Sequence, residues 1–261
     1  MHSQPHQPFE LLSRSFRQLG RRALDFVLPP VCLRCRTLVS DPQSLCAKCW
    51  SELKFLAEPL CACCGLPFPH ALGAGVKCAA CVARPPVFSK ARAALAYDDI
   101  SRDLILPLKH ADRLEAATIF ARWMANAAAD LITETDTLVP VPLHWRRLAK
   151  RRYNQAAVLA HEIARMHKLH VDTAALQRPR PSVSQGEMPS ARARLKNVAR
   201  AFTVADAQKE RIAGRRILLV DDVLTTGATL NACAKALKRA GAASVSAVTL
   251  ARVVRPLNPY L

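Results

Sequence analysis

Apolar runs alternate with amphipathic stretches along the last two thirds of the chain. The apolar runs predict buried strands in four segments, 91–99, 135–142, 215–222 and 244–254. Apolar residues at helical spacing predict helices at 100–110, 114–130, 153–168 and 229–240. Strands that alternate with helices are typical of a doubly wound α/β fold with a mostly parallel sheet. We expect this fold for a domain of residues 87–261.

The amino-terminal 86 residues follow a different pattern. Residues 9–28 place apolar side chains at helical spacing with arginines largely between them, which predicts a basic amphipathic helix within a leader of residues 1–29. This helix would pack on the next domain or, alternatively, make a peripheral contact with a membrane surface. A cysteine-rich domain of residues 30–86 follows and ends at Pro85 and Pro86, which mark a linker.

Eight of the ten cysteines form four Cys-x2-Cys pairs: Cys32, Cys35, Cys46, Cys49, Cys61, Cys64, Cys78 and Cys81. Two such turns supply the four thiolates of a tetrahedral zinc site, so the block predicts two structural Zn²⁺ ions. Sequential pairing is favoured over interleaved pairing. A thioredoxin-like redox motif would require one pair at the start of a helix in a βαβ unit, and four successive pairs do not fit it.

The formal net charge of +18 is concentrated in residues 141–200, which hold 13 basic and 3 acidic residues. Such a field attracts the phosphates of a nucleotide-like ligand, of nucleic acid or of an anionic membrane surface. The sequence shows no signal peptide and no run of about 18 apolar residues. We therefore expect a cytoplasmic protein whose cysteines bind metal instead of forming disulfides.

The stretch LLVDDVLTTGAT, residues 218–229, carries the most specific chemistry. Asp221 and Asp222 are expected at the carboxyl end of a buried strand, where α/β sheets bind ligands. Threonine hydroxyls, a glycine and the free N–H groups of a following helix would form a cradle for a phosphate. Carboxylates instead suit vicinal hydroxyls, directly or through Mg²⁺. Together these groups predict a ribose 5-phosphate site.

Three other interpretations of this stretch are weaker. A receiver-like acidic pocket would need a phosphorylatable aspartate on a later strand, and no Asp or Glu follows Asp222. A Walker A loop is excluded because no GxxxxGK[ST] occurs. An N-capping aspartate would explain one carboxylate but not both.

The stretch ILLVDDVLTTGAT also resembles the ribose-phosphate signature of type I phosphoribosyltransferases. Three further motifs accompany the cysteine pairs: LPLKH at 106–110, VPVPLHWRRLAKRRYNQ at 139–155 and QGEMPSARARLKNVARAF at 185–202. With them the chain resembles, over roughly residues 30–253, the ComF family of competence-associated proteins, which includes GntX-like members.

The resemblance implies a type I phosphoribosyltransferase fold preceded by a small zinc-binding domain. It also implies that phosphoribosyl pyrophosphate binds together with Mg²⁺, and it assigns roles to individual residues. The ribose hydroxyls would bind to Asp221 and Asp222, and the phosphate to Thr225, Thr226, Gly227, Ala228 and Thr229. The pyrophosphate loop would be Val141, Pro142 and Leu143. Candidate contacts to phosphate or DNA are Arg147, Arg151, Asn154, Gln155, Arg178, Arg180 and Arg194, of which the last three lie in a Pro-rich mobile loop at 178–197.

The catalytic residues stay unassigned. Purine-salvage members of the superfamily have an aspartate general base where this chain has Thr225, and threonine cannot act as a base at neutral pH. Two departures from the ComF pattern accompany this one: Arg152 replaces a usual glycine, and the Pro-rich loop is one residue longer.

Two functions follow from the resemblance. The favoured one is a ribose-phosphate-binding protein in DNA uptake and natural transformation, with single-stranded DNA and DNA-uptake proteins as partners. Few aromatic residues could stack on bases near the basic region: Trp145, Tyr153 and Phe202. The alternative is a metabolic phosphoribosyltransferase that acts on an unknown acceptor.

Overall fold

The apolar runs form one sheet in the computed structural model, which describes residues 29–108, 114–179 and 201–254. The sheet has five strands in the order β1-β5-β4-β2-β3, and every pair of neighbours is parallel. The strands are β1 (Ala91–Ala96), β2 (Thr137–Pro140), β3 (His170–Val171), β4 (Arg216–Leu224) and β5 (Ser244–Arg252). The α/β fold with a parallel sheet that the sequence predicts is therefore confirmed.

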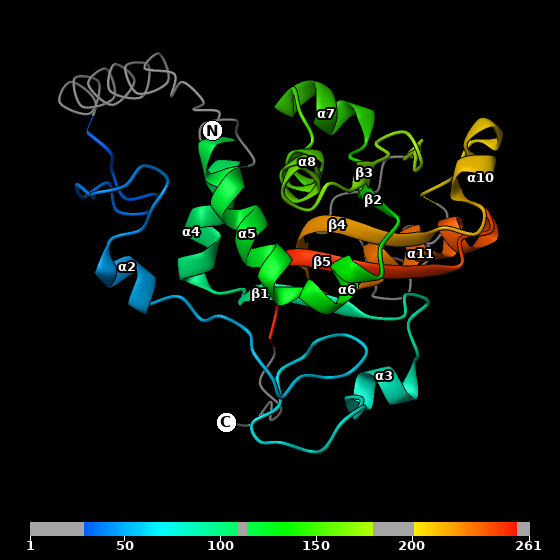
Figure 1. Ribbon diagram of the computed structural model, residues 1–261, viewed down its shortest axis with the longest axis horizontal. Helices are drawn as coiled ribbons and strands as arrows, with labels where there is room; N and C mark the ends of the chain where they lie inside the picture. Colours follow the sequence, from blue (N-terminus) through cyan, green and yellow to red (C-terminus); the bar gives the residue numbers. More distant parts are fainter. Residues whose placement is uncertain (1–28, 109–113, 180–200, 255–261) are drawn as a thin grey trace, which may run out of the picture. The chain divides into compact units, whose positions relative to one another are not determined.

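Helices cover both faces of this sheet (Figure 1). The helical segments of this part of the chain are α4 (Asp99–Leu108), the 3-10 turn η1 (Leu114–Ala116), α5 (Ala117–Ala127), α6 (Ala129–Thr133), α7 (Trp145–Arg151), α8 (Gln155–His167), α10 (Asp206–Ile212) and α11 (Ala228–Arg239). The connections through α5, from β1 to β2, and through α8, from β2 to β3, run in one direction across the sheet. The connection through α11, from β4 to β5, runs in the opposite direction. Because parallel crossovers are right-handed, α5 and α8 lie on one face and α11 on the other.

The chain divides into two compact units, Met1–Ser51 and Glu52–Leu261. One cysteine cluster and α2 (Ala47–Ser51) belong to the first unit. The other cluster and α3 (Ala79–Ala83) belong to the second unit, together with the sheet. The helix expected at 9–28 lies outside the described residues. Among the described helices, none is long and apolar enough to cross a membrane.

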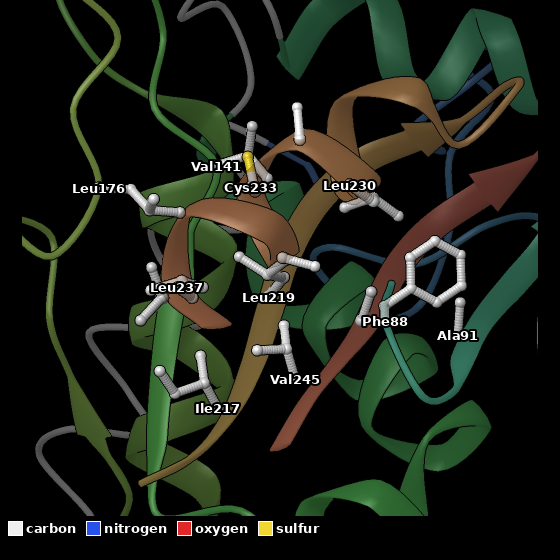
Figure 2. Close-up of a cluster of buried hydrophobic side chains, with 14 of the residues drawn as sticks. Phe88, Ala91, Val141, Leu176, Ile217, Leu219, Leu230, Cys233, Leu237 and Val245 are labelled. Carbon is white, nitrogen blue, oxygen red and sulfur yellow. The ribbon is translucent and has the colours of Figure 1, made fainter. Parts of the chain in front are cut away.

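The core on the α11 face is built from alternate residues of the central strands. Ile217 and Leu219 of β4 point toward α11, where they meet Leu230, Cys233 and Leu237 (Figure 2). Cys233 is completely buried, and its burial raises the pKa of its thiol. It is part of the hydrophobic core, as the sequence pattern indicated.

The expected end of the central strand is wrong. The sequence places the end of the central strand at Asp222, whereas β4 continues to Leu224 because it pairs with β5 along its whole length, up to Leu224 opposite Arg252. Successive side chains of a strand point to opposite faces. Asp221 and Asp222 are therefore separated by the sheet itself and do not form a single acidic pair.

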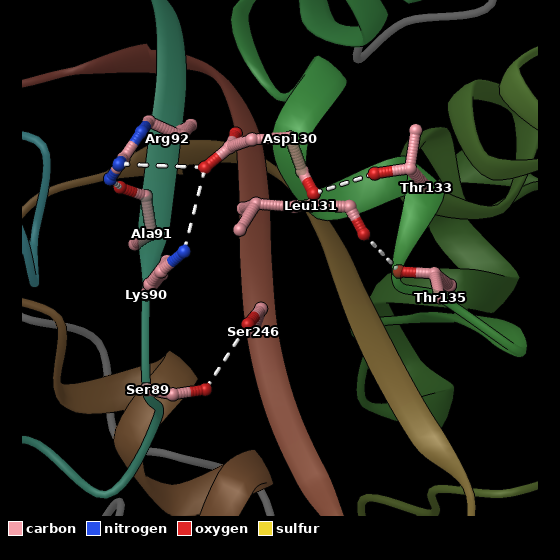
Figure 3. A network of polar contacts seen from close by, with 9 residues as sticks. All are labelled: Ser89, Lys90, Ala91, Arg92, Asp130, Leu131, Thr133, Thr135 and Ser246. Carbon is pink, nitrogen blue, oxygen red and sulfur yellow. Dashed lines mark hydrogen bonds and ion pairs between the residues drawn. The ribbon is translucent and has the colours of Figure 1, made fainter.

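The edge strand β1 is protected by contacts on both sides of its backbone and by ion pairs. Residues 54–56 add two antiparallel hydrogen bonds, from Leu56 N to Ala94 O at 2.9 Å and from Ala96 N to Lys54 O at 2.9 Å. The side chains of Lys90 and Arg92 reach the carboxylate of Asp130 on α6, each at 3.7 Å (Figure 3). A covered edge cannot pair with another chain.

Gly65 lies against the same edge. Its φ is +65°, and a Cβ added to it would stand 2.6 Å from Ala91 O. We expect Gly65→Ala to lower the free energy of unfolding, measured by denaturant titration, by about 1–3 kcal/mol more than a glycine-to-alanine change that strains the backbone without a close contact. Gly75→Ala is the matched control, since Gly75 has a φ of +76° and nothing within 4 Å of its added Cβ. Equal losses in the two variants would contradict this close packing.

Candidate functional site

The eight paired cysteines gather into two groups of four. Cys32, Cys35, Cys46 and Cys49 form one group and Cys61, Cys64, Cys78 and Cys81 the other, with the sulfur atoms of each group within 4.8 Å of one another. Two sulfur pairs are 3.6 and 3.7 Å apart. A tetrahedral Zn²⁺ with bonds of about 2.3 Å requires a separation of about 3.8 Å. Both groups therefore fit structural zinc sites, and the expected sequential pairing is confirmed.

The two groups are built by a duplicated backbone. Cys32 N donates to Thr37 O and Cys61 N to Leu66 O, both at 2.8 Å. Each group is completed by a short helix, α2 or α3, that begins directly after its third cysteine. Although burial acts to raise it, the pKa of Cys61 falls to about 7 because backbone N–H groups, first that of Cys78, donate to its sulfur. A stabilised thiolate is the form that binds zinc.

The second cysteine group is joined to the sheet near the expected phosphate loop. Arg252, the last residue of β5, is buried and donates to the carbonyl of Cys64. Ala91 N donates to Cys63 O at 2.7 Å. Val87 N donates to Oδ1 of Asn231 in the first turn of α11 at 2.7 Å. This zinc-type segment is therefore bonded to β1 and to the end of β5, and the adjoining Val87 bonds to α11, the helix that follows the loop.

The expected phosphate loop connects β4 to α11. Thr225 and Thr226 are exposed, and Gly227 is buried with a φ of +77° at the position before the helix. Only glycine adopts this conformation without strain, so its presence lets the loop turn directly into α11. Asn231 N is the first amide bonded within the helix, to Gly227 O. Ala228 N donates to Oγ1 of Thr226 at 3.5 Å. The amides before Asn231 precede the first helical hydrogen bond, and such amides can donate to an anion.

The two aspartates have different surroundings. Asp221, on the α11 face, is half-buried, and its carboxylate accepts from Asp222 N at 2.9 Å. It is close enough to Arg178 and Cys233 to influence the pKa of both. Asp222, on the α8 face, is only 8% exposed and accepts from Nε2 of Gln155 at 3.1 Å. Asp221 is therefore the more accessible carboxylate.

The residues expected to contact phosphate after β2 also hold the local structure together. Asn154 caps α8, because its Oδ1 accepts from Ala156 N at 3.1 Å and its Nδ2 donates to Val141 O at 3.0 Å. Arg151 donates to Oε1 of Gln155 at 3.3 Å. The chain of contacts from Arg151 through Gln155 to Asp222 fixes the segment after β2 against the central strand.

The expected pyrophosphate loop, Val141 to Leu143, lies at the same edge as the phosphate loop, since Val141 N donates to Val220 O at 2.9 Å. Arg147 follows on α7 and is exposed. Arg178 is largely covered, with its guanidinium 5.1 Å from the centre of the Phe202 ring. Arg180 and Arg194 lie outside the described residues, as does most of the Pro-rich loop.

Sequence reasoning missed His144. It is 4% exposed, its Nδ1 accepts from Arg146 N at 3.3 Å, and it thereby caps α7. Burial, followed by the charges of Arg146, Arg178 and Arg147, lowers the pKa of its imidazole. Its place directly after the pyrophosphate loop was the available signal, because a polar residue before a helix is a potential cap.

Both parts of the chain match known domain families. Residues 23–82 match the double zinc ribbon domain and residues 124–256 the phosphoribosyl transferase domain. The DNA utilization protein YhgH of Escherichia coli is 31% identical over 87% of this chain and 99% of that protein. Competence protein F of Haemophilus influenzae is 29% identical over 85% of this chain and 96% of that protein.

Two further similarities are more distant. Competence protein ComFC of Bacillus subtilis is 26% identical over 82% of this chain and 87% of that protein. Among solved structures, the glutamine phosphoribosylpyrophosphate amidotransferase of B. subtilis is similar at 20% identity and a TM-score of 0.35, over 51% of this chain and 26% of that one.

Zinc should stabilise the two units separately. We expect Cys46→Ser and Cys78→Ser, which change corresponding positions, each to lower the zinc content from two ions to one by mass spectrometry. Only Cys78→Ser should also lower the midpoint of the main thermal transition, by about 10 °C or more, because its group shares a core with the sheet. Cys63→Ala, which removes a neighbouring thiol outside the group, should keep both ions. Equal thermal shifts in the two serine variants would contradict this assignment.

Gln155 should control the pH dependence of stability through Asp222. Gln155→Glu places a second carboxylate where Nε2 now donates to Asp222, so the folded pair holds a proton that the unfolded chain releases near pH 4. We expect the unfolding free energy of the variant to fall relative to the unchanged protein as pH rises from about 4 to 7. Gln177→Glu, which adds the same carboxylate at an exposed position, is the control. A difference that is independent of pH would contradict the contact.

Proposed function

Because this chain belongs to the ComF family, the family of the competence proteins and of YhgH, we propose that it binds a ribose 5-phosphate and acts in the handling of DNA. Phosphoribosyl pyrophosphate with Mg²⁺, or a related ribose phosphate, is the proposed ligand. The match to the phosphoribosyl transferase domain and the names of the relatives support the two halves of this proposal.

The observation that carries it is the connection from β4 to α11. One continuous segment offers a half-buried carboxylate at Asp221, hydroxyls at Thr225 and Thr226, and the free amides of a helix twelve residues long. Carboxylates accept hydrogen bonds from hydroxyl groups, and helix amides donate to anions. The segment therefore has separate groups for the sugar and for the phosphate of one ligand.

The surrounding charge favours a ligand with more than one phosphate. Arg147 and Arg178 both lie near enough to His144, the residue that follows the pyrophosphate loop, to lower its pKa. Mg²⁺ would neutralise part of a diphosphate when it is bound there. Asp221 is the carboxylate best placed to contact such a hydrated ion, because Asp222 is buried against Gln155.

Recognition is better supported than transfer. The loop contains no ionisable base, since Thr225 occupies the position of the aspartate found in purine-salvage enzymes. Positioning and charge neutralisation could still promote loss of pyrophosphate without a base. We therefore place binding first and keep transfer to an unknown acceptor as the alternative that product analysis would reveal.

Calorimetry with phosphoribosyl pyrophosphate and Mg²⁺ tests the ribose-phosphate half. Asp221→Asn removes the charge but keeps an oxygen for Asp222 N, so it should fold normally and bind at least about tenfold more weakly. Asp206→Asn, which changes an exposed aspartate on α10, should bind as the unchanged protein does. Failure of the unchanged protein to bind, or equal affinities of all three proteins, would contradict the proposal. Release of pyrophosphate with a labelled acceptor, followed by mass spectrometry, would establish the transferase alternative.

A further inference from the structure

Helix α7 carries exposed side chains that the ribose-phosphate site does not use. Its sequence, WRRLAKR, contains four basic residues and no acidic one. Trp145 is 61% exposed at its first position, and Leu148 is 42% exposed one turn later. The guanidinium of Arg146 lies 5.3 Å from the centre of the Trp145 ring. We refer to Trp145, Arg146 and Leu148 as the α7 surface.

We propose that the α7 surface is a docking site for single-stranded DNA, with a base stacked on Trp145 and the adjoining phosphates held by the arginines of α7. This inference rests on the DNA half of the proposed function, to which it adds a place and a mode of binding. Base stacking on an exposed aromatic ring tolerates any sequence, and arginines along the strand neutralise its phosphates.

The exposure of Trp145 distinguishes it from the other aromatic residues of this region. Phe202 is buried beneath Arg178, and Tyr153 is half-buried. Trp123 is buried in contact with Phe55, with ring centres 5.3 Å apart. In the described part of the second unit, Trp145 is thus the tryptophan available for stacking, and Arg146 stabilises its ring by a cation–π contact.

The charge around α7 fits a polyanion. Between Asp136 and Glu162 the sequence has no acidic residue, whereas it has five basic ones, at positions 146, 147, 150, 151 and 152. This segment therefore contributes no carboxylate that would repel a phosphodiester backbone. Of these basic residues, Arg151 is directed inward to Gln155, while Arg146 and Arg147 are exposed.

The position of α7 connects it to the ribose-phosphate site. The helix begins five residues after the last residue of β2, at the carboxyl edge of the sheet, and His144 caps its first turn. In Figure 1 it lies on the side of α8 remote from β4, so it is presented away from the core. A strand bound to α7 would therefore run along the edge at which the ribose phosphate is proposed to bind.

An anionic lipid surface is the competing partner, since exposed Trp and Arg also occur on interfacial helices. Helices of that kind need a continuous apolar face. Here Trp145 and Leu148 are the large apolar residues exposed on a helix of seven residues. Stacking requires only one ring, so the observed surface favours nucleic acid.

Fluorescence anisotropy with a labelled oligo(dT) of about 16 nucleotides tests this surface. We expect Trp145→Ala to weaken binding about five- to 100-fold and Trp145→Phe to restore most of the loss. Arg146→Gln should reduce the slope of log affinity against log salt by about 0.7. Trp50→Ala, which removes a tryptophan 48% exposed in the first unit, and Arg165→Gln, which removes an exposed arginine on α8, are the matched controls and should change neither quantity.

The outcomes separate this inference from the proposed function. If the unchanged protein binds oligo(dT) and Trp145→Ala binds equally well, the α7 surface is wrong while the DNA half of the proposed function stands. If the unchanged protein does not bind oligo(dT), both fail, and calorimetry still decides the ribose-phosphate half. If Trp145→Ala loses binding to phosphatidylglycerol–phosphatidylcholine vesicles but still binds oligo(dT), the α7 surface is a lipid contact and the proposal is wrong. Loss of phosphoribosyl pyrophosphate binding in Trp145→Ala would indicate a structural role and overturn the proposal.

Discussion

The hydrogen bonding of β4 along both of its edges is the constraint on which the rest of the structure depends. The strand pairs in parallel with β2 on one side and with β5 on the other, so the carboxyl ends of all three strands meet at one edge. The alternation of side chains along β4 then directs Asp221 toward α11 and Asp222 toward α8. Two adjacent and chemically identical residues thereby acquire different surroundings, one accessible and one held by Gln155.

Three separate connections join the second zinc-type segment to the sheet domain. Its backbone bonds to β1, its neighbour Val87 bonds to α11, and Arg252 joins it to the end of β5. A metal bound in this position would therefore support β1, the end of β5 and α11, the helix that follows the phosphate loop. The first cysteine group has the same local geometry but lies in a separate compact unit. The duplication has therefore produced two similar metal sites with different structural surroundings.

The sequence predicted the chemistry of the site more accurately than its arrangement. The four cysteine pairs, the parallel sheet and the loop after β4 all follow from short-range patterns of spacing and hydrophobicity, and each agrees with the structure. The end of β4, helix α7 and the role of His144 did not follow. The end of β4 depends on a contact that is distant in sequence, Leu224 opposite Arg252. Helix α7 and the cap at His144 lie in a short polar segment that has no periodic hydrophobic pattern.

The sequence by itself determined which groups are available: thiolates at metal spacing, two carboxylates, hydroxyls before a helix and an excess of arginine. Only the tertiary structure decided which of them are accessible. The side-chain amide of Gln155 already donates to Asp222 and that of Asn154 to Val141, whereas the ring of Trp145 remains exposed. The physical reason is that residue type sets what a side chain can bind, but burial and long-range hydrogen bonds determine whether those atoms already have partners within the protein.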